Sequence, residues 1–283
     1  MTSHPEVVLT VGGMSLTVDP AAGARATAWT VDGLSLLTRH GSAAVEYGMY
    51  PMGPWAGRLR DNRLTYAGRR FDLPRTYGEW AIHGTVYDKP AEVIDLEQGP
   101  ESARLLARVS DHPAWPWPMH IDIEWHLRER AMTTVLSVHA HADEFPAVVG
   151  WHPWFARRLD RGGPLEWSVD AVQQVERGAG HLPTGRLVPF DPSAGPFDDA
   201  FVVPSGRARV RWPGALAVDV AADAGWYVVF DELDDAVCLE PQSGPPNGVN
   251  DGLGGPIATA TPGRPLRLVT TWDVSDDPLG DPA

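Results

Sequence analysis

The chain has 283 residues and a formal net charge of −14, and 22 of its 23 basic residues are arginines. This acidic balance argues against nucleic acid or an anionic membrane surface as the main partner. Cys238 is the single cysteine, which excludes an internal disulfide and a metal site built from cysteines. The sequence shows neither a signal-like N-terminal stretch nor an apolar run that could span a bilayer, so we expect a soluble cytoplasmic protein.

From the N-terminus onward, apolar and polar residues alternate with a period of two, which is typical of β-strands. Five pairs of such segments flank turn residues and predict β-hairpins: residues 7–11 with 14–18, 25–31 with 34–37, 63–66 with 69–73, 92–96 with 103–109, and 120–127 with 133–140. Further strands are predicted at residues 165–169, 208–212, 216–220, 226–230 and 266–274.

No segment predicts a helix, because the 27 prolines and 29 glycines recur too often to leave a helical span. Some fifteen or more short strands indicate an all-β fold, either a sandwich or a large open barrel. Without a composition break or an internal repeat, we expect one domain over residues 1–283. Residues 1–5 and 276–283 are expected to form irregular ends.

The stretch from 236 to 250 predicts a short apolar strand that carries Glu240 into a loop rich in proline, glycine and asparagine. Pro241 lacks an N–H group and is expected to end the regular strand pairing. A carboxylate at the end of a rigid strand is held well enough to act as a catalytic base. A solvated acid at a strand end is the alternative interpretation.

Two segments in the first third of the chain carry polar residues in unusual settings. Arg58 lies between the apolar residues Ala56 and Leu59, and it is either a binding residue or a surface arginine whose stem covers apolar area. His83 precedes Gly84, which lacks a Cβ atom and would let backbone or a ligand approach the imidazole. A purely structural histidine is the alternative there.

Two later segments have the same character. His152 lies among aromatic residues in the run VVGWHPWF, which suits either a sugar site or a core histidine. Asp198 and Asp199 are adjacent acids between two phenylalanines. Neighbours on a strand point to opposite faces, so at most one of these acids is expected to face a shared pocket. A solvated turn or a helix cap is the alternative for either acid.

The chain contains no GxSxG, HExxH, GxGxxG or Walker A motif. His139 and His141 could share one face of a strand and bind a metal ion, but the sequence shows no third ligand, so ordinary histidines are the better interpretation. Cys238 is expected to face the same side as Glu240, two residues on, and to act as a small apolar filler.

Five blocks, taken in order, resemble the aldose 1-epimerase (galactose mutarotase) family: PWAGRLRDNRLTYAGRRFDLP, AIHGTVYDKPAEV, GWHPWF, FDDAF and LEPQSGPPNGVN. The resemblance covers residues 49–250, and the last block is its most specific part. It implies a large antiparallel β-sandwich and an isomerase that needs no cofactor. It also implies that Glu240 is the catalytic base, that His152 is the catalytic acid and that His83 is a second active-site histidine.

The same resemblance implies the residues that bind the sugar. Arg58 and Asp198 fall on the family's sugar-binding positions, and Asp199 is the alternative to Asp198 by one residue. Trp154 and Gln242, from the same blocks, complete the predicted substrate-binding set. The family often has asparagine where this chain has Gly57, and tyrosine where it has Trp154. Both differences bear on which sugar is bound rather than on the acid–base pair.

The expected partner is therefore a small, unphosphorylated aldose, with the protein a monomer or a homodimer. Three alternatives remain open at this point. One is a carbohydrate-binding protein of the same fold without catalysis. Another is a glycoside hydrolase that uses Glu240 and Asp198 as a carboxylate pair about 5–9.5 Å apart. The third is a hexose-6-phosphate 1-epimerase, which would need a cluster of arginines at the pocket.

Overall fold

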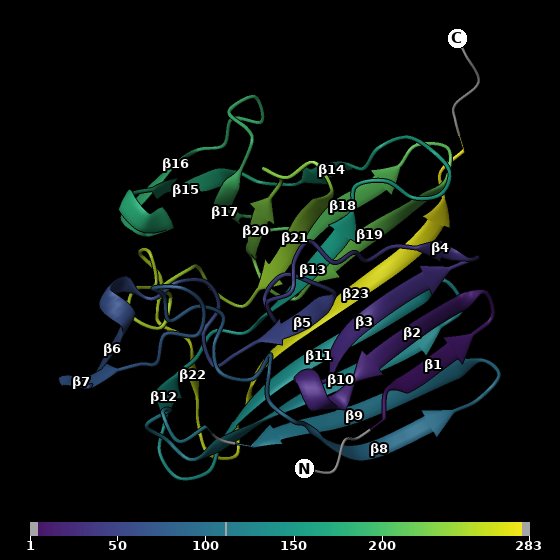
Figure 1. Cartoon of the computed structure of the whole chain (residues 1–283). Coiled ribbons are helices and arrows are strands. Elements are labelled where there is room, and N and C mark those ends of the chain that lie inside the picture. The colour runs from purple at the N-terminus through teal and green to yellow at the C-terminus, as the bar shows by residue number, and fades with distance from the viewer. Residues whose placement is uncertain (1–4, 111, 279–283) are drawn as a thin grey trace.

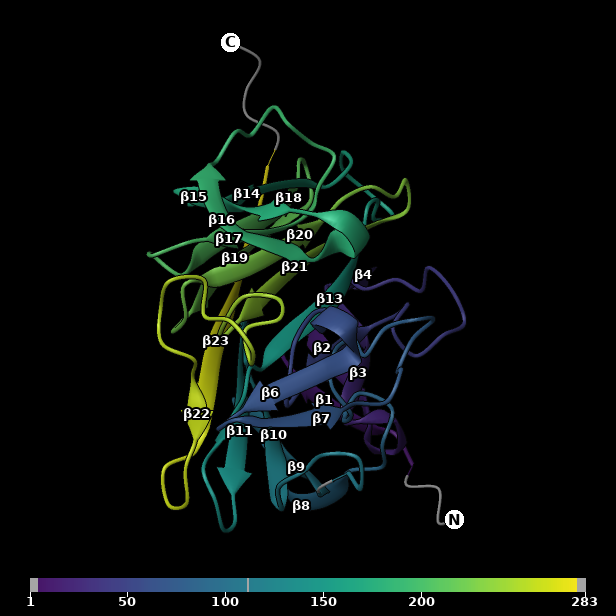
Figure 2. The same ribbon diagram turned by 90° about the vertical axis from the view of Figure 1, so that its left-hand side faces the viewer.

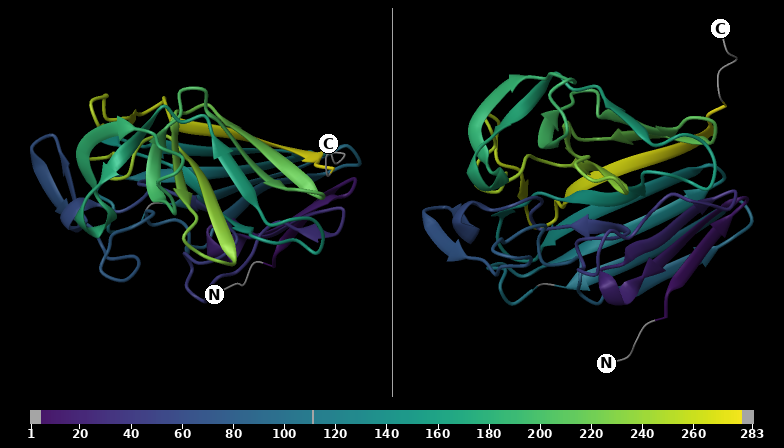
Figure 3. Two further views of the ribbon diagram at one scale, coloured as in Figure 1. Left: turned by 90° about the horizontal axis from the view of Figure 1, so that it is seen from above. Right: turned by 45° about the horizontal axis from the view of Figure 1, so that its top comes forward.

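The computed structural model describes residues 5–110 and 112–278 as two large antiparallel sheets packed against each other (Figures 1 and 3). The larger sheet contains, in spatial order, β1 (Val7–Val11), β2 (Met14–Asp19), β3 (Arg25–Val31), β5 (Met49–Met52), β13 (Gly150–Ala156), β21 (Ala236–Gln242), β20 (Trp226–Phe230), β17 (Asp198–Val202), β15 (Gln173–Arg177) and β16 (Pro183–Pro189), with β4 (Leu34–Ser35) paired to β3.

The smaller sheet contains β14 (Glu166–Val169), β18 (Arg207–Trp212), β19 (Leu216–Ala222), β23 (Leu266–Asp276), β11 (Ala131–Ala140), β10 (Met119–Arg128), β9 (Ser102–Ser110) and β8 (Glu92–Gln98). Two small pairs complete the fold: β6 (Arg63–Tyr66) with β7 (Arg69–Asp72), and β12 (Phe145–Pro146) with β22 (Thr259–Ala260). The β6–β7 and β15–β16 hairpins project from the same side of the molecule (Figure 2).

The predicted all-β sandwich is confirmed, as are all five predicted hairpins. One hairpin is shorter than expected, because β4 ends at Ser35 and Leu37 instead forms a bridge with Phe155 of β13. Within the described ranges the helical segments are single 3₁₀ turns: η1 (Pro20–Ala22), η2 (Arg60–Asn62) and η3 (Ala179–His181). No helix in these ranges is long and apolar enough to cross a membrane. The expected irregular ends lie mostly outside the described residues.

Tryptophans fill the space between the sheets and connect them. Trp125 of β10 donates its indole N–H to the Ala24 carbonyl beside β3 at 3.1 Å, and Trp212 of β18 donates to Ala156 of β13 at 2.8 Å. Trp29 of β3 and Trp272 of β23 meet edge to face. Each donated bond satisfies the one polar group of a large buried ring, so these residues combine apolar burial with a fixed spacing between the sheets.

The strand that carries Glu240 differs from its prediction. Pro241 does not end the pairing, because β21 continues to Gln242 and Pro241 lies opposite Tyr227 of β20. On the other side, β13 contributes no paired residue between Cys238 and Gln242. Pro241 thus lies where one of the two neighbouring ladders is already open, and its missing N–H is tolerated in a central strand.

Candidate active site

Glu240, from the middle of the larger sheet, lines a cavity of about 290 Å³ and is almost completely buried. This volume is at the lower end for small-molecule sites in proteins. The cavity is also lined by the other residues that the sequence predicted for the site, which are His152, His83, Arg58, Asp198, Trp154 and Gln242. The structure therefore brings together all seven predicted residues from five separate segments of the chain.

His152 and Glu240 lie on the neighbouring strands β13 and β21, with Nε2 of His152 3.2 Å from Oε1 of Glu240. Gln242, two residues beyond Glu240 on the same side of the strand, donates its Nε2–H to Oε2 of Glu240 at 3.1 Å. Both carboxyl oxygens thus have a polar neighbour inside the cavity. Cys238, two residues before Glu240, is fully buried.

Tyr50 of β5 is the cross-strand partner of His152, and its ring stacks on the imidazole with the centroids 4.6 Å apart. Arg25 lies behind Tyr50 and is fully buried, with its guanidinium 4.8 Å from the Tyr50 ring. Arg25 also donates to the carbonyls of Tyr47 and Tyr87 at 2.8 and 2.9 Å. These contacts fix the wall against which the His152 imidazole stands.

His83 lies on a loop beside the strands and has a positive φ of 60°, which is uncommon for any residue except glycine. Its ring meets that of His152 edge to face at 5.0 Å. Gly84 is needed here for backbone contact rather than for a ligand, since a Cβ atom there would lie 1.9 Å from the Gly53 carbonyl oxygen. The strained backbone at His83 is the kind found at functional sites.

Arg58 is held close to His83, because Arg58 forms a bridge with Ile82 and the His83 N–H donates to the Gly57 carbonyl at 3.1 Å. Gly57 has a positive φ of 69°. Glycine and asparagine adopt this conformation most readily, so the difference from the family at this position leaves the backbone unstrained. The loop after β21 is anchored to the same segment through Asn247, whose Oδ1 accepts the N–H of Arg60 at 3.1 Å.

Asp198 and Asp199 both border the cavity, so the expectation that at most one would do so is wrong. Asp198 is the first residue of β17, where strand alternation only begins. Its Oδ2 lies 3.6 Å from Nη1 of Arg58 and 2.6 Å from Nδ1 of His181. Asp199 is more deeply buried, and its Oδ1 lies 3.3 Å from Nε of Arg177.

Arg177 and His181 are cavity residues that the sequence analysis missed. They lie four residues apart near the β15–β16 hairpin, and no motif distinguishes them from surface residues. Trp154 was predicted, and its ring stacks on the imidazole of His152. Its indole N–H donates a hydrogen bond to the Val45 carbonyl at 3.0 Å. Trp154 therefore offers the cavity only apolar ring surface.

Burial shapes the protonation of the three predicted catalytic residues. It raises the pKa of the Glu240 carboxyl well above its usual range, and the charge of Asp198 adds to this effect. Burial also lowers the pKa of His152 to about 3, with a further contribution from Arg25. The pKa of His83 is held well below its ordinary value by burial, then by His152 and Arg58. The directions of these two shifts both favour an uncharged pair, with the carboxylic acid form of Glu240 beside a neutral His152 imidazole.

Unpaired polar atoms concentrate in the same cavity. Twelve buried side-chain nitrogen and oxygen atoms of the described residues lack a hydrogen-bond partner, and five of them belong to cavity residues. These five are Nε of Arg58, Nδ1 of His83, Nδ1 of His152, Oδ1 of Asp199 and Oε1 of Gln242, and of these the Asp199 oxygen lies in an ion pair with Arg177 that is not a hydrogen bond. Buried polar atoms rarely stay unpaired, so this arrangement is suited to a ligand with several hydroxyl groups.

The ligand atoms of His152, Cys238 and Glu240 also lie within 4.8 Å of one another and could enclose a metal ion. However, burial and then Glu240 raise the pKa of the Cys238 thiol well above its usual value. A thiol must lose its proton to bind a metal ion, so metal binding here would have to overcome this raised pKa. This favours the predicted role of Cys238 as an apolar filler beneath the acid–base pair.

A sequence model of the aldose 1-epimerase family matches residues 5–244. The chain is 24% identical over 276 residues to YphB, an uncharacterized protein of Escherichia coli strain K12, covering 90% of this chain and 94% of that protein. Among solved structures, a galactose mutarotase-like protein from Clostridium acetobutylicum has a TM-score of 0.82 at 14% identity, covering 96% of each chain. Galactose 1-epimerase from Lactobacillus acidophilus has a TM-score of 0.77 at 17% identity, covering 96% of this chain and 94% of that one. At such identities these structures establish the fold.

Proposed function

Since this chain belongs to the aldose 1-epimerase family, we propose that it interconverts the α and β anomers of a free hexose such as galactose or glucose. The observation that carries the proposal is the contact between Glu240 and His152, whose Oε1 and Nε2 atoms are 3.2 Å apart in a buried cavity. Anomer interconversion needs one base at the C1 hydroxyl and one acid at the ring oxygen, which is what such a pair supplies.

The proton transfers balance without any further reactant. Glu240, as the carboxylate, takes the proton of the C1 hydroxyl while His152, as the imidazolium, protonates the ring oxygen, and the C1–O5 bond breaks. The open aldehyde rotates about C1–C2. The ring then closes on the other face of C1 as His152 takes back the C5 hydroxyl proton and Glu240 returns its proton to the C1 oxygen. Each positioned group contributes on the order of 10²–10⁴-fold to the rate.

We propose that Glu240 and His152 together carry one proton, which is the number that this cycle needs. A carboxylic acid beside a neutral imidazole and a carboxylate beside an imidazolium differ only in where one proton lies along the 3.2 Å contact. A sugar hydroxyl that donates to Glu240 stabilises the carboxylate, so substrate binding favours the reactive form. We assign Gln242 to orient the carboxyl through its 3.1 Å hydrogen bond.

We assign His83 to hold a sugar hydroxyl rather than to act as an acid. Among the described residues it forms no ion pair with a carboxylate, unlike His152, and its buried Nδ1 has no partner there. Arg58 and Asp198 would grip further hydroxyls from the opposite wall through charge-assisted hydrogen bonds. Trp154, whose ring stacks on the imidazoles of His152 and His40, would offer apolar contact to the sugar from the part of its ring that lines the cavity.

The charges around the cavity favour an unphosphorylated sugar. Its two arginines are Arg58 and Arg177, and each lies within 4 Å of an aspartate. Glu46 and Glu240 add further acidic groups to the lining. A phosphate would need basic charge that is not already neutralised. A preference for galactose-6-phosphate over galactose would contradict this assignment.

Polarimetry on freshly dissolved α-galactose and α-glucose tests the activity. Glu240→Gln keeps the size of the side chain but removes the base, so we expect it to lower turnover far more than sugar binding. Glu97→Gln, an exposed strand residue, is the matched control. Wild-type protein that binds sugar without speeding the change in rotation would point to a carbohydrate-binding protein, and release of an aryl group from an aryl glycoside would point to a hydrolase.

The cytoplasmic location and the monomeric or homodimeric state stay predictions.

A further inference from the structure

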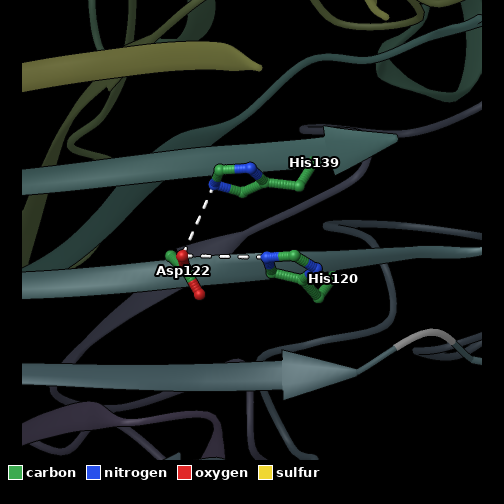
Figure 4. A group of neighbouring side chains, drawn as sticks. All are labelled: His120, Asp122 and His139. Carbon is green, nitrogen blue, oxygen red and sulfur yellow. Dashed lines mark ion pairs between the residues drawn. The ribbon is translucent and has the colours of Figure 1, made fainter. Parts of the chain in front are cut away.

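A second group of histidines and a carboxylate lies on the smaller sheet, away from the cavity (Figure 4). His120 and Asp122 are two residues apart on β10, and His139 is the cross-strand neighbour of His120 on β11. The adjacent residues Ile121 and Ile123 are buried in the core, so alternation places this group on the outer face of the sheet. None of the three residues lines the sugar cavity.

The three side chains converge on one point. Nε2 of His120 lies 3.7 Å from Oδ2 of Asp122, and Nε2 of His139 lies 3.4 Å from the same oxygen (Figure 4). Both separations are too long for good hydrogen bonds. Zinc binds imidazole nitrogen and carboxylate oxygen at about 2.0–2.2 Å in a tetrahedron, whose ligand atoms are then about 3.4 Å apart. The observed spacing therefore suits ligands around a common ion better than a hydrogen-bonded pair.

A fourth residue holds one of the rings in a useful orientation. Nδ1 of His120 lies 2.7 Å from Nε2 of His141, which follows the end of β11. When His120 donates from Nδ1, its Nε2 keeps a lone pair that faces Asp122. The His120 and His139 rings are also stacked, 4.4 Å apart and nearly parallel. Support of a ligand histidine by a hydrogen bond from its other nitrogen is usual at metal sites.

The carboxylate of the group is shared with an arginine but keeps room for an ion. Arg108 binds both oxygens of Asp122, with Nε 2.7 Å from Oδ1 and Nη2 3.0 Å from Oδ2. Because a carboxylate has about four acceptor positions, Oδ2 can bind an ion while Oδ1 keeps its bond to Arg108.

We propose that His120, His139 and Asp122 bind one divalent transition-metal ion of the Zn²⁺ class on the outer face of the smaller sheet, with His141 supporting His120. Two imidazoles and one carboxylate are ligands that suit zinc, copper and nickel rather than calcium or magnesium. Water would complete the coordination, since the group is partly exposed. The ion would join the neighbouring strands β10 and β11 through their side chains.

Calorimetric titration of Zn²⁺ into the full-length chain, without an affinity tag, tests the site. We expect one ion per chain in the wild type. His141→Ala should weaken binding about 10–100-fold, as removal of an outer-shell partner does. His120→Gln and His139→Gln should each weaken it further. The matched control is His126→Gln, because His126 faces Glu124 at 3.0 Å on the same face of β10 but has no second imidazole in contact.

Two further measurements separate this site from the sugar cavity. Co²⁺ should give visible absorption bands with the wild type that disappear in His139→Gln, while mutarotation by that variant stays unchanged. Absence of saturable Zn²⁺ binding to the wild type would overturn the proposal, and so would undiminished binding by both His120→Gln and His139→Gln. Loss of the ion in Glu240→Gln but not in His139→Gln would place it in the cavity instead and would also overturn it.

Discussion

Within the described residues, the cavity and the outer face of the smaller sheet each bring histidine and carboxylate side chains together across neighbouring antiparallel strands, and the two groups differ mainly in burial. In the cavity, the side chains of His152 and Glu240 are 8% and 3% exposed. On the outer face, those of His139 and Asp122 are 33% and 13% exposed, and Arg108 neutralises the carboxylate with two short hydrogen bonds. Glu240 has no such arginine partner among the described residues, and its ion-pair contact is with His152 instead. The same residue types thus favour proton transfer where burial makes charge costly, and stay accessible to a cation where the side chains are partly exposed.

The largest expected difference between the two groups is in catalysis. His152→Gln removes the proposed acid and should lower kcat for mutarotation by about 10²–10⁴-fold. His139→Gln is the same substitution in the outer group and should leave kcat within the error of the measurement. Equal losses in both variants would mean that the two regions are not functionally separate.

A second contrast concerns the buried arginine behind the cavity. Arg25→Met leaves the carbonyls of Tyr47 and Tyr87 unpaired in the core, so we expect a loss of about 2–4 kcal/mol in the free energy of unfolding. Arg209→Met breaks an exposed pair with Asp219 and should cost at most about 1 kcal/mol. Urea denaturation measures both. In Arg25→Met the His152 ring should also change its tilt. The kcat of the fraction that remains folded measures this effect.

The pH dependence of kcat/KM tests the shared proton. A second proton joins the pair only near the lowered pKa of His152, about 3, so activity should persist through pH 4–5. Activity should fall as rising pH removes the last proton, at a pH set by the raised pKa of Glu240. A profile whose acid limb is centred near pH 4.5, the ordinary value for a glutamate, would contradict this assignment.

The smallest expected effect is on the pH dependence of thermal stability. The pKa of Glu240 is raised in the folded state, so the wild type loses stability as pH rises from the unfolded value near 4.5 through the folded one. Glu240→Gln carries no charge and avoids this loss. Its Tm should therefore exceed that of the wild type above neutral pH, and the difference should shrink towards pH 4. A higher Tm for the wild type at pH 8 would show that the ion pair with His152 outweighs burial.

Local patterns explain which strands the sequence could predict. The hairpins were found because each joins two half-buried strands through a short turn, as in β9, where buried residues alternate from Ala103 to Val109. Strands β5 and β13 were missed because nearly all of their residues are buried, which removes the alternation. The order β5–β13–β21 joins segments about 100 residues apart, and no local pattern records it.

The residues of the two candidate sites likewise divide into those that the sequence predicted and those that it did not. Glu240, His152 and His83 were predicted because their blocks resemble a known family. Arg177 and His181 were not, since they resemble surface residues until the β15–β16 hairpin places them at the cavity. His139 was interpreted as an ordinary histidine for want of a third ligand, and Asp122 is supplied to it by the neighbouring strand.

The sequence by itself determined that this protein is built from β-strands and which side chains are available for acid–base chemistry, because alternation and turn residues act over a few positions. Only the tertiary structure decided which strands became neighbours, and hence that Glu240 contacts His152 while Asp122 faces two imidazoles and an arginine. Burial and distance set the charge of these groups, and both arise from contacts between segments that are far apart in the chain.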